Sequence, residues 1–361
     1  MKKILMTASE SSHFKNFHIP YIKYMQERGC RVFTASRGGP ALGGVEHTTL
    51  NFRKKLFHAG NIGVLLKLSR LIRKNGFDTV YTNSTLAGFI GRAAVILSRR
   101  KRTKTVHICH GYLFSDDGSL RSRVYLFFER LVRKRTDILA VMNREDMEIA
   151  EKYSLGKRIV FINGMGVESR KFPRVQEEEI RKMQSRLGRR GDETLFLCVG
   201  EFSPRKNQKT IIEACAGLEG DYRMVFAGDG RELEACRQLC EKLGVTDRTV
   251  FLGHFENMNL LYRSCHCLIS ASRFEGLPFN VMEALYCGED IIVSDVKGNN
   301  DLAREHGGMI YPYSDAAGLT ELMNGQLLKG AENEAQSRLA EKYLSDKVLP
   351  ENVKFLEING N

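Results

Sequence analysis

The sequence predicts an α/β protein made of two doubly wound, parallel-sheet domains, and three observations support this. The chain has 361 residues and 42% apolar residues, enough for two cores of ordinary size. Short apolar runs alternate with segments of helical periodicity in both halves, as in strand–helix–strand units. The net charge also differs between the two halves. Residues 1–165 hold 30 Lys and Arg against 12 Asp and Glu, and the remainder holds 25 Lys and Arg against 31 Asp and Glu. We therefore expect domains at 1–165 and 166–344, with a tail of about 345–361 packing back on the first.

The first half predicts a sheet whose strands alternate with helices. A polar loop at 9–14 follows the first strand, and a helix containing Phe17, Ile22 and Met25 follows that loop. Ligands of such sheets bind at the carboxyl ends of the strands. The expected strands are 4–8, 32–35, 79–82, 105–109, 138–141 and 160–162.

Basic residues of the first half gather in three places. Residues 51–75 mix leucine and phenylalanine with lysine and arginine, and shorter basic runs lie at 99–102 and 133–135. Such a segment is typical of helices that lie on an anionic membrane, but equally of a helix that packs on the core and leaves a basic face in water. A positive field also attracts nucleic acid and anionic substrates.

Cysteine usage and the apolar runs indicate a cytoplasmic protein without a metal site. The nine cysteines are scattered, and the pairs 236/240 and 265/267 lack zinc-finger spacing. Most lie in apolar runs, as core thiols of a reducing compartment do. The first apolar run is too short for a signal peptide, and none is long enough to span a membrane.

The second half repeats the alternation after a link at 164–168. Strands are expected at 195–199, 223–227, 250–252, 267–270, 291–294 and 309–311. Near the end, residues 335–344 predict a helix, Pro350 is expected to break the pattern, and 352–356 are expected to form a last turn.

The stretch 270–288 carries the strongest functional signal. A buried strand ends at Ser270, a loop with Gly276 follows, and Pro278 suits the first turn of a helix. Free backbone N–H groups and the helix dipole make such a junction an anion site. Glu275 and Glu283 are separated by seven residues. Because a carboxylate would repel phosphate, we expect both glutamates to bind neutral hydroxyls. The alternatives are that Glu283 is a solvated helix residue and that Glu275 is a helix cap.

Four pieces in order, at 199–207, 226–230, 250–254 and 275–283, resemble the retaining glycosyltransferases of family 4 (glycosyl transferases group 1). That family has the GT-B architecture, two Rossmann-like domains facing across a cleft. The resemblance covers about the whole chain. It is specific in the second half and looser in the first, at 110–111, 143–146 and 166–168.

The resemblance implies roles for individual residues. Lys206 would contact the donor diphosphate, with Arg205 beside it, Glu283 would hold the ribose hydroxyls, and Glu275 and His110 would lie at the donor sugar. The family usually has an arginine where this chain has Glu201, so we expect either that Arg205 substitutes for it or that Glu201 points away. The implied catalytic residues are Glu275, Lys206 and His110; the implied donor-binding residues are Arg205, Lys206, Gly228, His254, Phe255, Gly276, Leu277, Pro278, Phe279, Asn280 and Glu283; the acceptor-side candidates are Ser11, His13 and Gly111.

The implied reaction moves a sugar with retention from a nucleotide sugar, by family frequency a UDP-sugar, to a saccharide acceptor. No Asp-x-Asp sequence is present, so no metal is expected. The basic first half favours a lipid-linked acceptor at the inner membrane face, in capsule, exopolysaccharide or O-antigen assembly. No nucleic-acid partner is expected, because the sequence has no RNP-like aromatic motif, zinc spacing or recognisable helix-turn-helix. The alternatives are a sugar-nucleotide epimerase on the same fold, a nucleic-acid-binding protein, and a non-catalytic nucleotide-sugar sensor.

Overall fold

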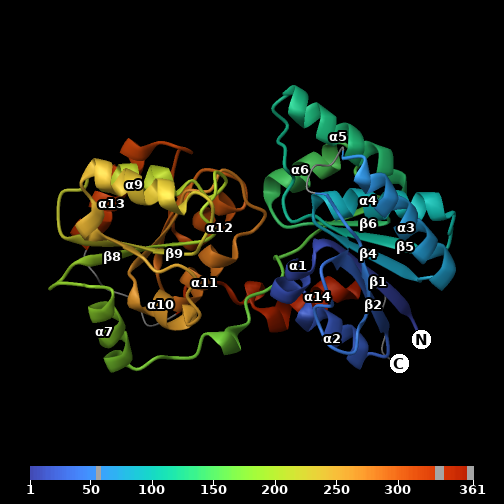
Figure 1. Ribbon diagram of the computed structural model, residues 1–361, viewed down its shortest axis with the longest axis horizontal. Coiled ribbons are helices and arrows are strands. Elements are labelled where there is room, and N and C mark those ends of the chain that lie inside the picture. Colours follow the sequence, from blue (N-terminus) through green and yellow to red (C-terminus); the bar gives the residue numbers. More distant parts are fainter. Residues whose placement is uncertain (54–57, 330–336, 356–361) are drawn as a thin grey trace. The chain divides into compact units, whose positions relative to one another are not determined.

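The computed structural model describes residues 1–53, 58–329 and 337–355 (Figure 1). Contacts between Cα atoms divide the chain into two compact units. Unit 1 comprises Met1–Gly166 and the segment that starts at Asp346, and unit 2 comprises Val167–Ser345. Each unit is described by itself below.

Unit 1 is a parallel sheet with helices on both faces. Its strand order, β3-β2-β1-β4-β5-β6-β7, reverses direction between β1 and β4, which makes the sheet doubly wound. Figure 1 shows α3, α4 and α5 on one side of the sheet and α1, α2 and α14 on the other. The strands are β1 Lys3–Glu10, β2 Arg31–Arg37, β3 Glu46–Thr49, β4 Thr79–Asn83, β5 Lys104–Ile108, β6 Ile138–Val141 and β7 Arg158–Phe161. The helices are α1 Ser11–Phe17, α2 Ile19–Glu27, α3 Gly60–Asn75, α4 Thr85–Ser98, α5 Leu120–Val132, α6 Arg144–Lys152 and α14 Ser345–Lys354, with a 3-10 turn at Arg133–Arg135.

The segment after β1 differs from its prediction. The polar loop expected at 9–14 does not exist, because β1 continues to Glu10, whose carboxylate pairs with Arg37 of β2, and α1 begins at Ser11. The single helix expected next is divided at His18. Pro20 stands in the first turn of α2, where its missing N–H costs nothing, but it lacks the N–H that would continue a helix from α1.

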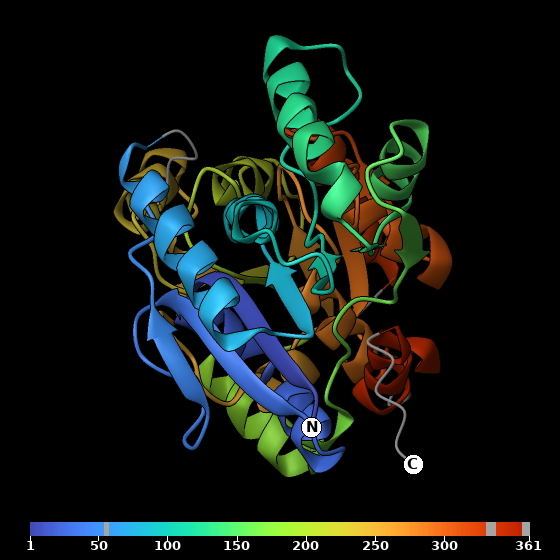
Figure 2. The same cartoon turned by 90° about the vertical axis from the view of Figure 1, so that its right-hand side faces the viewer.

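The expected membrane segment at 51–75 packs on the core along much of its length. Its helix, α3, buries Val64, Leu68 and Ile72 against the sheet, which is the alternative noted for this segment. Figure 2 shows α3 crossing in front of the strands. Ile62 and Leu66 remain exposed on its outer face, and residues 54–57 of the segment lie outside the described residues.

Unit 2 is a second doubly wound parallel sheet, in the order β10-β9-β8-β11-β12-β13. All six predicted strands are present within two residues at each end. Helix α8 contacts α9 and α13, and helix α10 contacts α7 and α11. The strands are β8 Thr194–Val199, β9 Tyr222–Ala227, β10 Thr249–Phe251, β11 Cys267–Ser270, β12 Asp290–Ser294 and β13 Met309–Tyr311. The helices are α7 Glu177–Arg186, α8 Gln208–Cys215, α9 Leu233–Leu243, α10 Met258–Ser264, α11 Phe279–Cys287, α12 Asn299–His306 and α13 Ala316–Lys329, with 3-10 turns at Ser169–Lys171, Thr246–Arg248 and Glu341–Tyr343.

The segment from residue 337 onward also differs from its prediction. The described part of the helix expected at 335–344 contains only the 3-10 turn Glu341–Tyr343, and Pro350 lies inside α14 instead of ending a helix. Packing holds α14 despite the missing N–H of Pro350. Asn352 is buried, and its Nδ2 donates to Tyr21 Oη at 2.9 Å and to the Gly164 carbonyl at 2.8 Å. The turn expected at 352–356 is helical as far as Lys354, and residue 356 lies outside the described residues.

Two further features concern the cysteines and the length of the helices. All nine cysteines are buried. In the described parts of the chain, every helix is too short or too polar to cross a bilayer.

A buried ion pair joins α4 to α5. Arg92 Nη2 and Nη1 donate to the two carboxylate oxygens of Glu129 at 2.7 and 2.8 Å, and both side chains are almost fully buried. The Glu129→Gln substitution should lower the free energy of unfolding by about 3 kcal/mol, because it leaves a buried guanidinium without its counter-charge. Glu46→Gln, which breaks the exposed pair with Arg31, should cost under about 1 kcal/mol. Urea denaturation measures the free energy of unfolding of both variants. Equal losses of stability would contradict the conclusion that the Arg92–Glu129 pair is buried.

Candidate functional site

The loops that follow β8, β9 and β11 meet at one edge of the unit 2 sheet. β8 lies between β9 and β11, where the strand order reverses, and parallel pairing puts the three carboxyl ends at this edge. This is the position where doubly wound sheets bind ligands. The predicted donor-binding residues lie on these loops, on the loop after β10, and on α11.

Glycines let the loops after β8 and β9 approach each other. Gly228 has φ +142°, its N–H donates to the Gly253 carbonyl, and a Cβ there would lie 2.1 Å from the Gly200 carbonyl oxygen. A Cβ on Gly230 would lie 2.3 Å from the Phe202 carbonyl oxygen. A side chain at either position would push the loops apart, so the sequence specifies this close backbone approach.

Two cations share one carboxylate at this edge. Lys206 Nζ donates to Glu275 Oε1 at 2.7 Å, and Arg205 Nη1 donates to the same oxygen at 2.9 Å. Burial raises the pKa of Glu275, but Lys206 and Arg205 outweigh it and hold the pKa below its ordinary value. Glu275 is therefore an anion that positions both cations. Of the two, Arg205 is the more exposed, with 38% of its side chain in solvent against 13% for Lys206.

The start of α11 lies in the same loop system. Pro278 is the residue before the helix, not in its first turn as predicted, so Phe279 begins the helix. Asn280 Nδ2 donates to the Val199 carbonyl at the end of β8, which fixes the helix start beside Gly200. Leu277 is buried, and a Cβ on Gly298 would lie 2.4 Å from the Gly276 carbonyl. Gly276, Leu277, Pro278, Phe279 and Asn280 thus form a fixed turn that leads into the positive end of a helix dipole.

Glu283 lies one turn into α11 and is half-buried. Its Oε2 accepts a hydrogen bond from Tyr262 Oη of α10 at 2.9 Å. Burial raises the pKa of Glu283 to about 7, although the Tyr262 hydrogen bond opposes the rise. Glu283 is thus neither the solvated residue of the alternative interpretation nor fully ionised at neutral pH. Sequence patterns did not indicate Tyr262, since it comes from a different helix.

The remaining unit 2 positions lie on exposed loops. His254 is exposed and Phe255 half-buried, just after Gly253, whose carbonyl is bonded to Gly228. Glu201, at the position where the resemblance implies an arginine, is exposed. Its carbonyl accepts from Gln208 Nε2, which ties the loop after β8 to α8.

In unit 1 the predicted His13 and His110 come together. His110 follows β5, His13 lies on α1, and their ring centres are 4.6 Å apart with an edge-to-face arrangement. His110 Nε2 also contacts Asn83 Oδ1, at the end of β4, at 3.4 Å. Burial lowers the pKa of His13 to about 4 and the pKa of His110 well below its usual value, so both rings are neutral at pH 7.

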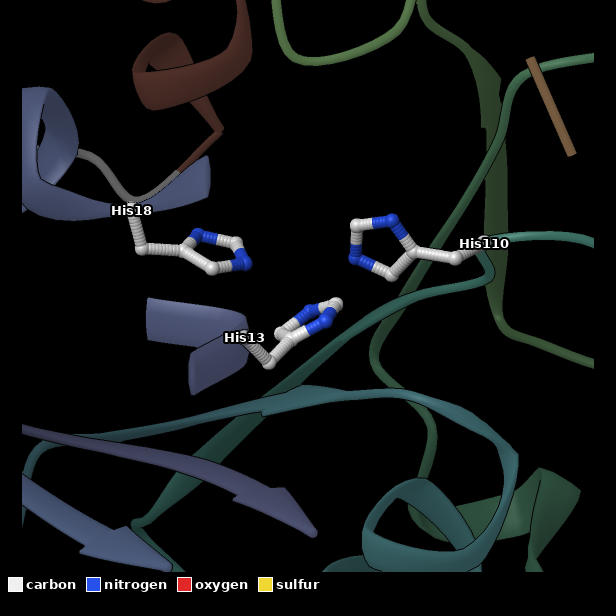
Figure 3. Close-up of side chains that lie close together, drawn as sticks. All are labelled: His13, His18 and His110. Atoms are coloured by element: carbon white, nitrogen blue, oxygen red, sulfur yellow. The ribbon is translucent and has the colours of Figure 1, made fainter. Parts of the chain in front are cut away.

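Ser11 and Gly111 lie on the flanks of these histidines. Ser11 opens α1, and a Cβ on Gly38 would lie 2.7 Å from its Oγ, so the loop after β2 approaches it closely. Gly111 has φ +98° and directs the chain to Tyr112, whose N–H donates to Asp146 Oδ2 at 2.9 Å. A third histidine, His18, joins His13 and His110 (Figure 3). Sequence patterns did not indicate His18, because His110 is remote in sequence and His13 lies across a helix break.

Comparison with known proteins identifies the family. Residues 21–163 match the model for the glycosyl transferase 4-like domain, and residues 179–346 match the model for glycosyl transferases group 1. "Putative glycosyltransferase EpsD" of Bacillus subtilis (strain 168) is 30% identical over 323 residues, which are 88% of this chain and 85% of that protein. The chain belongs to the glycosyl transferases group 1 family.

Other relatives of this glycosyltransferase agree with that assignment. The UDP-Gal:alpha-D-GlcNAc-diphosphoundecaprenol alpha-1,3-galactosyltransferase of Escherichia coli is 28% identical over 262 residues, 70% of this chain and 66% of that protein. Among solved structures, Anabaena Alr3699/HepE in complex with UDP and glucose has a TM-score of 0.79 at 16% identity, covering 99% of this chain and 100% of that one. WaaG, a glycosyltransferase involved in lipopolysaccharide biosynthesis, has a TM-score of 0.73 at 17% identity, covering 99% of each chain. The predicted GT-B class of two parallel-sheet α/β domains is confirmed.

Proposed function

We propose that this glycosyltransferase moves a sugar, with retention, from a UDP-sugar to a lipid-linked saccharide in capsule, exopolysaccharide or O-antigen synthesis. The observation that carries the proposal is the pair of cations, Lys206 and Arg205, held on one oxygen of Glu275 beside the start of α11. The E. coli relative named for UDP-Gal and a diphosphoundecaprenol acceptor supports the donor and acceptor classes.

The chemistry follows from where charge develops. As the bond between the sugar anomeric carbon and the phosphate oxygen breaks, UDP gains negative charge and the sugar becomes cation-like. Lys206, Arg205 and the amides that begin α11 would stabilise the departing diphosphate. Both cations pair with Glu275, so a diphosphate must share or displace that pairing. The acceptor hydroxyl would attack from the face that UDP leaves and pass its proton to the departing phosphate oxygen.

Glu275 and Glu283 have different proposed tasks. Glu283 would accept hydrogen bonds from the ribose hydroxyls. Glu275 would hold Lys206 and Arg205 and contact the donor sugar. In unit 1, His110 would contact that sugar, while Ser11, His13 and Gly111 would contact the acceptor.

A donor screen tests the function. UDP-, GDP- and ADP-sugars are incubated with undecaprenyl-diphosphate saccharides, and nucleotide release is measured. We expect UDP release from a UDP-sugar only when the acceptor is present. A change of sugar configuration without acceptor would support the epimerase alternative, and binding without turnover the sensor. Turnover should persist in excess EDTA, because the residues that would stabilise the diphosphate are cations and amides; its loss would contradict metal-independent catalysis.

We also propose that the protein works at the inner face of the cell membrane, and α5 provides the contact. Three large apolar side chains of this helix, Leu120, Phe127 and Leu131, are more than half exposed. An open groove beside them is lined by Arg123, Leu126, Phe127, Arg130, Leu131 and Arg133. Apolar side chains among arginines match the acyl boundary and phosphates of an anionic lipid surface. Figure 1 shows α5 at the periphery of unit 1.

Replacing Phe127 and Leu131 with aspartate should lower the fraction of protein that sediments with phosphatidylglycerol vesicles on the order of tenfold, because it removes apolar insertion and adds repulsion. Leu328→Asp is the matched control, since Leu328 is 90% exposed on α13 of unit 2. Equal sedimentation of all variants, or full turnover of a soluble acceptor without vesicle binding, would contradict the proposal. A salt-sensitive gel shift with RNA or DNA would instead favour nucleic acid as the partner of this surface.

A further inference from the structure

Three histidines of unit 1 converge on one small space. His13 lies on α1, His18 stands between α1 and α2, and His110 follows β5. One ring nitrogen from each lies within 4.8 Å of the others. In Figure 3 the rings of His18 and His110 face each other across this space, and His13 lies beside them.

The cluster leaves buried polar atoms unsatisfied. His18 is fully buried, and neither of its ring nitrogens has a hydrogen-bond partner among the described residues; nor does His13 Nε2. The ring neighbours of His18 include Tyr21 and Tyr81, whose ring centres lie 5.8 and 6.2 Å from that of His18. Burying a polar group without a partner costs on the order of 1–3 kcal/mol, so such groups call for an explanation. A bound species that accepts nitrogen lone pairs provides one.

The spacing of the rings suits a metal ion. With metal–nitrogen bonds of about 2.0–2.1 Å, three imidazoles on a tetrahedral ion have ring centres roughly 5 Å apart. The observed separations are 4.6 Å for His13 and His110, 5.0 Å for His13 and His18, and 5.9 Å for His18 and His110. Small rotamer changes of the partly buried His110 would close the largest gap, which separates it from His18. The contact of His110 Nε2 with Asn83 Oδ1, at 3.4 Å, is too long to compete strongly.

We propose that His13, His18 and His110 form a binding site for a divalent transition metal ion of the zinc class. A ligand set of three imidazole nitrogens favours Zn²⁺, Cu²⁺ or Ni²⁺ over Mg²⁺ or Ca²⁺, which prefer oxygen ligands. Three protein ligands leave a fourth tetrahedral position for water or another small ligand. His13 and His110 are partly buried, so the cluster is less enclosed at these two rings than at fully buried His18.

The site has a consequence that depends on the proposed function. His110 would contact the donor sugar, so an ion that holds its ring would compete with the donor. Bound zinc is therefore an inhibitor of transfer and not the metal of catalysis. Micromolar zinc should inhibit the wild type, and EDTA should restore its activity. His18→Gln should be several-fold less sensitive, since His18 has no proposed contact with either substrate; equal sensitivity would overturn the inhibitory role alone.

Metal binding itself is tested without activity. The full chain is stripped with EDTA, dialysed and titrated with Co²⁺, and Zn²⁺ is then measured by equilibrium dialysis. We expect one ion per chain, the strong visible absorption of tetrahedral Co²⁺, and displacement of cobalt by zinc. His18→Gln and His13→Gln should each weaken binding at least tenfold. His58→Gln is the matched control, because His58 is an exposed histidine of the same unit.

Two results would overturn the site. One is the absence of tetrahedral cobalt absorption in the wild type, which would indicate that a buried water satisfies the rings. The other is equal zinc binding by the wild type and both cluster variants. Thermal unfolding of the metal-free variants shows whether each still folds, and zinc should raise the Tm of the wild type but not of His18→Gln.

Discussion

Lys206→Ala should lower kcat for sugar transfer by about 100- to 1,000-fold, because it removes a nearly buried ammonium group from the position where the departing diphosphate gains charge. Lys206 also shares Glu275 with Arg205, so its loss leaves Arg205 as the remaining cation on that carboxylate. Steady-state kinetics with UDP-sugar and acceptor measure the effect. We expect KM to change less than kcat.

Lys209→Ala is the matched control for this prediction. Lys209 lies three residues along the chain, is half exposed and pairs with Glu232 at 3.3 Å, away from Glu275. Its removal should change kcat less than about twofold, as expected for an exposed ion pair. If Lys206→Ala and Lys209→Ala had the same small effect, the diphosphate would have to bind elsewhere.

Glu283→Gln should weaken UDP binding by about 10- to 100-fold at pH 8, yet make the ligand-free protein more stable at that pH. The carboxylate is the proposed acceptor for ribose hydroxyls, and an amide supplies one acceptor oxygen instead of two. Burial raises the pKa of Glu283 to about 7, so the ionised form is unfavourable in the folded state. Between the ordinary pKa and about 7, the folded protein binds more protons than the unfolded chain, so stability falls as pH rises.

The size of this cost follows from the pKa difference, which corresponds to roughly 3 kcal/mol once the pH exceeds both values. Thermal unfolding from pH 5 to pH 8 should show the wild type losing stability relative to Glu283→Gln. Calorimetric titration should show that UDP binds the wild type more tightly as pH rises through about 7, because the ribose hydroxyls would bind the ionised carboxylate of Glu283. The affinity of Glu283→Gln for UDP should depend less on pH.

Tyr262→Phe separates this explanation from a general change of the site. The Tyr262 hydrogen bond lowers the pKa of Glu283, so removing it should move the midpoint of the UDP-binding profile to higher pH. An unchanged midpoint would contradict the role of Tyr262, and a Glu283→Gln variant that kept the wild-type profile would contradict the role of Glu283.

Much of the fold was predictable because its signals are local. Short apolar runs marked β8, β9, β11 and their neighbours, and the strand–helix alternation implied parallel sheets. β3 was missed because Glu46–Thr49 is polar at both ends and lies at the sheet edge, where few apolar residues are needed. Pro350 misled the prediction of α14, because the burial of Asn352 and its neighbours outweighs the lost hydrogen bond.

The sequence by itself determined the two sheets, the glycine-rich loops between β8 and α9, and the positions of Lys206, Glu275 and Glu283 along the chain. These follow from residue type and spacing, which act over a few residues. Only the tertiary structure decided that Arg205 and Lys206 share one oxygen of Glu275, that Tyr262 contacts Glu283, and that His18 joins His13 and His110. Each of these contacts joins side chains from different elements, and their proximity depends on how the sheets order their strands and pack their helices.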